Sequence, residues 1–251
     1  MIPSQSPVPF PQGGVAVVVG AGGGIGAALL HGLEARGDFA RVVGCGRTAG
    51  SGRSAGSGRS AEIGLDLLAE PSIAAAAAQL RGLGDLRLVI DATGFLHGGG
   101  FTPEKSLRDL EPAHLAHAFA VNAIGPALLM KHLLPLLPRR GKAVFATLSA
   151  RVGNIGDNRL GGWYAYRASK AALNQLVRTA AVELHRRCPE AACVALHPGT
   201  VDTGLSGPFA KAGLDVQGPD ESAARLLAVI DRLGPSDNGG FFDHRGAAVP
   251  W

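Results

Sequence analysis

Cysteines and aromatic residues are scarce in this sequence. It has three cysteines, Cys45, Cys188 and Cys193, and the closest two are spaced C-x4-C rather than C-x-x-C. An odd number of cysteines without metal-ligand spacing excludes a disulfide framework and indicates reduced thiols in a cytoplasmic protein. Aromatic residues make up only 5% of the 251 residues. Aliphatic and small side chains must therefore build the core.

Long hydrophobic runs and strong charge are also missing. The most apolar stretch, residues 127–137, contains Lys131, His132 and Pro135 and is well short of the roughly 20 residues that span a membrane. No positive charge precedes an apolar stretch in residues 1–14, so we expect a Pro-rich leader rather than a secretory signal. The formal charge is +4, and the arginines are scattered. The sequence therefore predicts no membrane and no nucleic-acid partner.

Glycine, in contrast, is abundant, with 37 residues. The glycines have no three-residue period, which excludes a collagen-like chain, and aliphatic segments recur along the whole length, which argues against global disorder. A chain of this length can bury one sizeable core. We expect residues 15–251 to form a single α/β domain.

Apolar segments of two kinds alternate along the chain. Strands are predicted at Val15–Val19, Arg41–Cys45, Leu86–Asp91, Lys142–Leu148 and Ala192–His197, with weaker candidates at Glu62–Asp66 and Gly240–Phe242. Helices are predicted at Ala27–Arg36, Ser72–Arg81, Pro112–Leu137, Tyr164–Arg187 and Glu221–Leu233. This alternation predicts a Rossmann-type, doubly wound and mostly parallel sheet of seven strands, with helices on both faces.

A tandem repeat interrupts this pattern after the second predicted strand. The hexapeptide AGSGRS at 49–54 recurs unchanged at 55–60, and its composition predicts a flexible surface loop over 48–61. In one interpretation Arg53 or Arg59 reaches a bound anion. In the other, the repeat is a tolerated insertion without a role, because lengthening a surface loop costs little free energy.

A glycine cluster follows the first predicted strand. Gly20, Gly24 and Gly26 stand at the point where a buried strand turns into a helix. Without side chains the backbone can approach a pyrophosphate, and the helix N-terminus offers free N–H groups and a positive dipole end. The context favours a dinucleotide site over a plain glycine-rich turn.

A tyrosine and a lysine stand four residues apart in the predicted helix Tyr164–Arg187. Tyr166 and Lys170 therefore share one face of that helix. A phenol has an ordinary pKa of about 10, and a neighbouring ammonium favours the phenolate, so we expect Lys170 to lower the pKa of Tyr166. Such a pair can exchange a proton with a carbonyl oxygen. The same spacing occurs in ordinary surface helices, and the upstream glycines are what favour a catalytic role.

The residue after the second strand decides which dinucleotide is bound. A carboxylate at this place bonds a ribose 2′-hydroxyl, whereas an arginine pairs with a 2′-phosphate. No acidic residue occurs between Asp38 and Glu62, and Arg47 follows the strand. NADP is therefore favoured over NAD, unless Arg47 is only a solvated loop residue.

These motifs resemble the short-chain dehydrogenase/reductase family. The G-x-x-x-G-x-G spacing is typical of it, although Val19 replaces the usual threonine. The stretch from Asn158 to Lys170 and the Gly-Gly-Phe-Phe-Asp segment with a terminal Pro-Trp resemble its C-factor and sniffer-like carbonyl reductases. The resemblance covers the chain from about Val15 onward, apart from the repeat.

The resemblance implies a set of cofactor contacts at the strand ends. They are Gly20, Gly23, Gly24, Ile25, Gly26, Asp66, Leu67, Ala92, Thr93, Gly94, Tyr166, Lys170, Pro198, Gly199, Val201 and Thr203, besides Arg47. The family usually has Asn-Asn-Ala-Gly where this chain has Asp-Ala-Thr-Gly at 91–94. Residues 204–218 correspond to a mobile lid over the substrate.

The resemblance also implies two further catalytic residues. Asn122 fits the family's asparagine, which holds a water in a proton relay; the alternative is an ordinary helix asparagine bonded to backbone. The family's active-site serine falls on Ala150, and Ser149 occupies the serine position before it. Either Ser149 turns into the site, or the hydroxyl is absent or comes from elsewhere, with Thr147 and Asn154 as candidates.

Two functions are compatible with these residues. The first is an NADP(H)-dependent oxidoreductase that interconverts a small ketone or aldehyde and an alcohol, with Tyr166 as acid/base and no metal. The second is a signalling or regulatory protein that binds the cofactor without turnover, which the missing serine at position 150 favours. The resemblance further implies a homodimer or homotetramer. His114 and His117 are interpreted as ordinary helix histidines.

Overall fold

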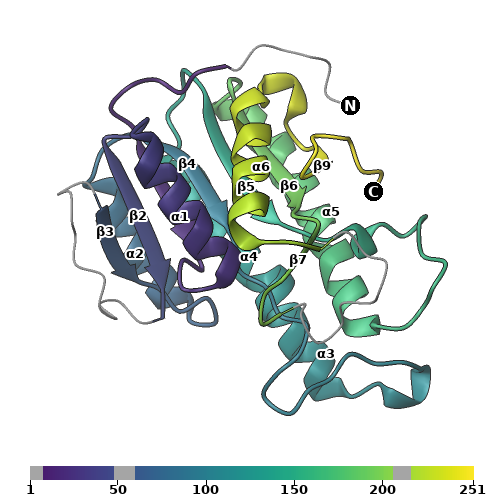
Figure 1. Cartoon of the computed structure of the whole chain (residues 1–251). Helices are drawn as coiled ribbons and strands as arrows, with labels where there is room; N and C mark the ends of the chain where they lie inside the picture. The colour runs from purple at the N-terminus through teal and green to yellow at the C-terminus, as the bar shows by residue number, and fades with distance from the viewer. Residues whose placement is uncertain (1–7, 48–59, 206–215) are drawn as a thin grey trace.

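The structure is a computed structural model that describes residues 8–47, 60–205 and 216–251 (Figure 1). Seven parallel strands form one sheet in the order β3-β2-β1-β4-β5-β6-β9, which confirms the predicted doubly wound sheet. The strands are β1 (Val15–Val19), β2 (Arg41–Gly46), β3 (Ser60–Gly64), β4 (Leu86–Asp91), β5 (Ala143–Leu148), β6 (Ala191–His197) and β9 (Phe241–Asp243). The strand order reverses between β1 and β4, and ligands bind at such a switch point in open α/β sheets.

Helices cover both faces of the sheet (Figure 1). On one face lie α1 (Gly24–Arg36) and α6 (Pro219–Arg232), and on the other lie α2 (Glu70–Arg81), α4 (Gly125–Leu133) and α5 (Tyr164–Arg187). Side chains along each strand alternate between the two faces of the sheet. Val18 of β1 packs on the face that α1 covers, and Phe145 of β5 packs on the face that α5 covers. Short 3-10 turns occur at Leu107–Asp109, Leu134–Leu136, Arg151–Gly153 and Pro235–Asp237.

The predicted helix Pro112–Leu137 is not continuous. It consists of α3 (Pro112–Phe119), a π-helical turn (Ala120–Ile124), α4 and a 3-10 turn. Pro126 explains the break, because it has no N–H to donate to the carbonyl of Asn122 and its ring crowds that carbonyl. The stretch 112–136 is long and apolar enough for a membrane span by composition, but α4 packs on α2 and α5 as a core helix.

Several predicted boundaries move by a few residues. The third strand is Ser60–Gly64 rather than Glu62–Asp66, so its first residues replace the end of the predicted loop 48–61. Residues 48–59, with the arginines of the repeat, lie outside the described residues. Three helices begin two or three residues before the prediction, because glycine or proline in the first turn hides the apolar periodicity. Residues 1–7 also lie outside the described residues. Within the rest of the predicted leader, Phe10 packs on Phe39 with their ring centres 5.1 Å apart.

A second, two-stranded sheet was not predicted from the sequence. It joins β7 (Thr200–Val201) to β8 (Val216–Gln217) in parallel. The predicted lid, 204–218, therefore ends in a strand, and its residues 206–215 lie outside the described residues. The ladder fixes the two ends of this segment against each other.

The three cysteines are free and buried. Cys45 and Cys193 lie on β2 and β6, on the face of the sheet that α2, α4 and α5 cover, and Cys188 follows α5. Burial raises the pKa of the Cys45 and Cys193 thiols to about 12. The three thiols are unpaired in the fold, and their reduced state stays a prediction.

Candidate active site

The turn after β1 brings the N-terminus of α1 against the sheet. Gly20 has a φ of +81°, which glycine adopts without strain, and its amide donates to the carbonyl oxygen of Cys45 at 2.8 Å. A Cβ at Gly26 would overlap the carbonyl oxygen of Gly20, so only glycine lets the helix begin this close to the strand. The first turn has no side-chain cap at the switch point of the sheet. This cradle fits a pyrophosphate.

The ends of β2 and β3 form the neighbouring part of this edge. Arg47 directly follows β2 and is exposed, as a guanidinium that reaches a 2′-phosphate must be. Asp66 Oδ1 accepts the amide of Leu68 at 3.0 Å, which fixes the turn after β3. A Cβ at Gly125 would overlap the side chain of Leu67, so glycine lets α4 pack on this turn. The cofactor contacts assigned to Arg47, Asp66 and Leu67 remain predictions.

A buried carboxylate closes β4. Asp91 is completely buried; its Oδ1 accepts the amide and hydroxyl of Thr93 at 3.1 and 2.6 Å, and its Oδ2 accepts the Thr147 hydroxyl at 2.7 Å. Burial raises the pKa of Asp91, and the hydrogen bonds and the Lys170 ammonium oppose this shift. Ala92 continues the edge and donates its amide to the Val19 carbonyl at 2.9 Å. Thr147 is thereby committed to Asp91.

Three predicted residues meet at one point above the end of β4. A Cβ placed on Gly94 would lie 3.8 Å from both Asn122 Oδ1 and Lys170 Nζ, so the amide and the ammonium face the same glycine. The Lys170 ammonium donates to the Leu148 carbonyl at 2.8 Å. Burial lowers the pKa of Lys170 to about 8, and the Asp91 carboxylate opposes this shift. The ammonium is therefore easier to deprotonate than that of an ordinary lysine.

Asn122 lies in the π-helical turn and is completely buried. Its Oδ1 accepts the amide of Phe95 at 2.7 Å, and its Nδ2 donates to the Phe95 carbonyl at 2.8 Å and to Ser169 Oγ at 3.0 Å. The Ser169 hydroxyl in turn donates to the Tyr166 carbonyl at 3.0 Å. Ser169 was missed in the sequence, and it ties the Tyr-Lys helix to Asn122. Turns of this π type are frequent at functional sites.

Tyr166 is the third residue of α5 and is partly exposed. The Lys170 ammonium stands 6.0 Å from the centre of its ring. Desolvation raises the pKa of Tyr166 to about 12, so the predicted lowering of this pKa is wrong. Loss of solvent around the phenolate outweighs the ammonium at this distance. The phenol keeps its proton at neutral pH and is able to donate it.

The hydroxyl expected to polarise a carbonyl has another partner. Ser149 is 3% exposed, and its Oγ donates to Asn174 Oδ1 at 2.6 Å, underneath α5. In this arrangement the Ser149 proton is not directed at a substrate. Ala150 follows at the end of β5, and the buried Asn154 accepts the Asp157 amide at 3.3 Å. Its side-chain NH2 group makes Asn154 the remaining donor among the predicted candidates.

The segment after β6 approaches the same edge from the other side. The Pro198 carbonyl accepts Gln217 Nε2 at 2.7 Å and the Ser222 hydroxyl at 3.0 Å, so β8 and α6 hold it in place. Gly199 has a φ of +85°, and Val201 is buried in β7. These contacts hold Pro198 and Gly199, two of the predicted cofactor contacts, at the carboxyl end of β6.

Thr203 lies against the start of α1, beside the glycine turn after β1. A Cβ added to Gly24 would lie 2.9 Å from the Thr203 methyl group, which places Thr203 directly over the first turn of α1. The predicted approach of Thr203 to the phosphates is consistent with this position. His97, in the loop after β4, contacts the carbonyl of Gly204 through Nε2 at 3.0 Å.

One buried pair was missed entirely from the sequence. Glu104 and His114 are 2% and 4% exposed, and His114 Nδ1 lies 3.2 Å from Glu104 Oε1. His114 was interpreted as an ordinary helix histidine, and no motif pointed to Glu104. A partner of the Glu104 carboxylate, the Ala165 amide, lies at the start of α5, 61 residues beyond Glu104 in the chain.

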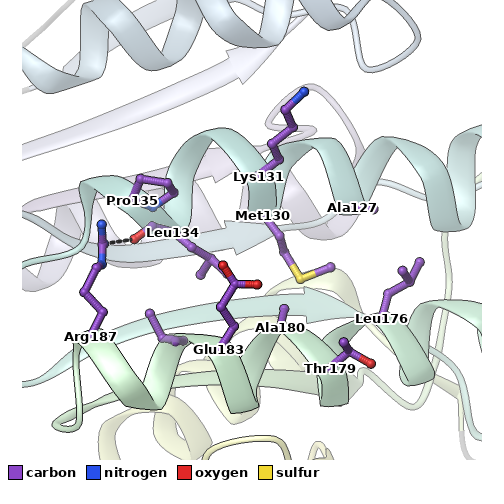
Figure 2. Close-up of a pocket in the computed structure, with 11 residues that line it drawn as sticks. Ala127, Met130, Lys131, Leu134, Pro135, Leu176, Thr179, Ala180, Glu183 and Arg187 are labelled. Carbon is purple, nitrogen blue, oxygen red and sulfur yellow. Dashed lines mark hydrogen bonds between the residues drawn. The ribbon is translucent and has the colours of Figure 1, made fainter.

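A groove of about 420 Å³ lies between α4 and α5, away from these residues (Figure 2). Met130 and Leu176 point into the space between the two helices, Glu183 extends from α5 toward α4, and Lys131 points away from α5. It contains none of the predicted site residues. Within the described ranges no three His, Cys, Asp or Glu side chains gather as metal ligands.

Comparison with known proteins decides the family. Residues 14–213 match the family described as short chain dehydrogenase. The chain belongs to the short-chain dehydrogenase family. Its sheet, glycine turn and Tyr-Lys helix are accordingly those of a short-chain dehydrogenase fold.

Relatives in this family cover most of the chain. A 1-hydroxy-2-glutathionyl-2-methyl-3-butene dehydrogenase of Rhodococcus is 31% identical over 94% of this chain and 98% of its own length. The C-signal protein of Myxococcus xanthus is 41% identical over 58% of this chain and 84% of its own length. An NADPH-bound carbonyl reductase from chicken fatty liver is 27% identical and has a TM-score of 0.83, with 99% and 100% of the two chains covered.

Proposed function

We propose that this short-chain dehydrogenase is an NADPH-dependent carbonyl reductase, which interconverts a ketone or aldehyde and an alcohol. The observation that carries the proposal is the meeting of Asn122 and Lys170 over Gly94, one helix turn from Tyr166 and beside the glycine turn of β1. The carbonyl reductase relative with bound NADPH supports the same assignment.

In the proposed reaction the protein supplies the proton. Tyr166 donates its phenolic proton to the carbonyl oxygen, and its raised pKa keeps the phenol protonated until then. Bound NADPH would supply the hydride. Lys170 would hold the ribose with its ammonium and stabilise the phenolate that forms, while Asn122 anchors the water of the proton relay.

The function is tested by steady-state NADPH consumption with a panel of ketones and aldehydes. We expect loss of NADPH absorbance with at least some of them, and formation of the corresponding alcohols. A chain that binds NADPH but consumes none across the panel would contradict the proposal. Binding is measured separately by isothermal titration calorimetry, so that absence of turnover is not confused with absence of cofactor.

Arg47 is proposed to select NADPH over NADH. Arg47→Ala removes the charge-assisted bond to the 2′-phosphate, so KM for NADPH is expected to rise about 10- to 100-fold. KM for NADH should change by less than about twofold, because NADH has no 2′-phosphate. Arg41, exposed at the opposite end of β2, offers the matched control Arg41→Ala. Equal losses with both cofactors would contradict the assignment.

The pH dependence of reduction should report Lys170. The pKa of Lys170 is lowered to about 8, so the ammonium is complete below pH 7 and is lost as the pH rises through 8. Tyr166 keeps its proton over this range, because its pKa is about 12. We expect kcat/KM to be level up to pH 7 and to fall about tenfold between pH 8 and pH 9.5. A level profile to pH 9.5 would exclude a role for the Lys170 charge.

A further inference from the structure

The helix that carries Tyr166 begins in an unusual way. The three residues before α5, Gly161, Gly162 and Trp163, all have positive φ values, at 64°, 66° and 53°. Trp163 is the N-cap residue and offers no side-chain oxygen, and the first turn of α5 contains no acidic residue. Helix starts normally carry Ser, Thr, Asp or Asn as caps. The amides at the start of α5 therefore need an acceptor from elsewhere.

Glu104 supplies that acceptor from the loop between β4 and α3. The Ala165 amide lies 3.3 Å from both carboxylate oxygens of Glu104, and the Trp163 amide donates to its backbone carbonyl at 2.6 Å. A Cβ at Gly162 would lie 3.3 Å from the same carbonyl, so glycine allows this close approach. Glu104 thus holds the residues on either side of Tyr164, immediately before Tyr166.

The Glu104 carboxylate is itself fixed in place. It is 2% exposed, and a buried carboxylate is costly unless it is paired and hydrogen-bonded. His114 Nδ1 lies 3.2 Å away on α3, and the imidazole stacks on Phe101 with ring centres 5.0 Å apart. The positive dipole end of α5 also favours the negative charge. Arg167 also fixes the residues before α5, because its Nε donates to the Gly162 carbonyl at 3.0 Å.

We propose that Glu104 is a positioning residue for Tyr166. It acts as a remote cap that sets where α5 begins, and thereby where the phenol stands relative to Lys170 and the carbonyl oxygen. The inference rests on the proposed function, since it assigns Glu104 to the proton-donating step. Tyr166 follows Ala165 directly, so release of the Ala165 amide displaces the phenol before it disturbs the rest of α5. Misplacement of a reacting group by about 1 Å can cost about 100-fold in rate.

A merely structural role of Glu104 predicts different behaviour. If Glu104 only stabilised its loop, its removal would lower the melting temperature without separating kcat from cofactor binding. Asp109 offers a matched control, because its carboxylate accepts the amides of Lys105 and Ser106 at 3.0 and 2.9 Å in the same loop. Asp109 makes no bond to α5 among its described contacts.

The test compares Glu104→Ala, Glu104→Gln and Asp109→Ala in the full chain. Glu104→Ala is expected to lower kcat for carbonyl reduction about 10- to 100-fold, with the Kd for NADPH unchanged within about twofold. Glu104→Gln keeps an acceptor for the Ala165 amide and should recover kcat to within about fivefold of the parent. Asp109→Ala should leave kcat within about twofold. A loss of kcat that Asp109→Ala shares, or that Glu104→Gln does not relieve, would overturn the proposal.

Hydrogen exchange keeps this test separate from the proposed function. The amides of Trp163 and Ala165 should exchange at least about tenfold faster in Glu104→Ala, while amides in the middle of α5 keep their protection. Unchanged exchange at Ala165 would overturn the proposal whatever the activity. Rapid exchange in a chain whose parent consumes no NADPH would instead contradict the proposed reaction and support the cap. If Glu104→Ala does not fold, His114→Phe takes its place, because it removes the partner of the Glu104 carboxylate. It should then lower kcat and speed exchange at Ala165 in the same direction, while Glu104→Gln stays near the parent.

Discussion

Tyr166→Phe is expected to lower kcat for carbonyl reduction by about 100- to 10,000-fold, the contribution of a positioned general acid. The ring and its packing against Trp163, at 6.2 Å between ring centres, are kept, and only the proton that would reach the carbonyl oxygen is removed. The Kd for NADPH should stay within about twofold, because the glycine turn and Lys170 are untouched. Steady-state kinetics and calorimetry measure the two quantities on the same preparation.

Tyr164→Phe is the matched control for this variant. Tyr164 begins α5 two residues earlier and is also partly buried, but the residue four positions on is Ala168 rather than a lysine. Its loss of a hydroxyl should change kcat by less than about threefold. Turnover by Tyr166→Phe at the parental rate would show that another group donates the proton.

Ala150→Ser is expected to raise kcat/KM by about 10- to 100-fold. A single hydrogen-bond donor toward a developing oxyanion contributes about 100- to 1,000-fold in enzymes that have one. Here the neighbouring hydroxyls are committed, Ser149 to Asn174 and Thr147 to Asp91. By resemblance to the family, the active-site serine falls on Ala150, so the added oxygen is expected to supply the missing donor. Steady-state kinetics with the best carbonyl substrate measures the gain.

Ser149→Ala separates a catalytic hydroxyl from a structural one. The substitution leaves Asn174 Oδ1 without its donor, so unfolding free energy should fall by about 1–3 kcal/mol while kcat changes by less than about threefold. A large loss of kcat in Ser149→Ala, together with no gain in Ala150→Ser, would return the role to Ser149. If neither variant changes kcat, Asn154 becomes the candidate donor.

Sequence patterns predicted the parts of the site that depend on neighbours in the chain. The glycine turn and the Tyr166–Lys170 spacing follow from motifs, and the doubly wound parallel sheet follows from the alternation of strands and helices; the fold has all three. The π-helical turn was missed because its apolar pattern is that of a continuous helix, and only Pro126 hinted at the break. Helix starts at glycine or proline were missed for a similar reason.

What the sequence could not supply depends on contacts across long distances in the chain. The Ser149 hydroxyl turns to Asn174, 25 residues later, and Glu104 reaches a helix 61 residues away. The direction of the Tyr166 pKa shift was also wrong, because desolvation depends on how deeply the folded chain buries the ring. The spacing along the helix indicates that Lys170 is near Tyr166, but it does not show how far burial removes solvent from the phenol and raises its pKa.

The buried cysteines make the protein convenient for chemical labelling. Cys45, Cys188 and Cys193 are all out of reach of solvent, and the pKa values of Cys45 and Cys193, at about 12, keep those thiols protonated. A cysteine introduced at an exposed position, such as Ile155 in the loop before Tyr166, would thus be the thiol that a maleimide dye modifies. A fluorophore there would report on the loop before α5 without removal of any native cysteine.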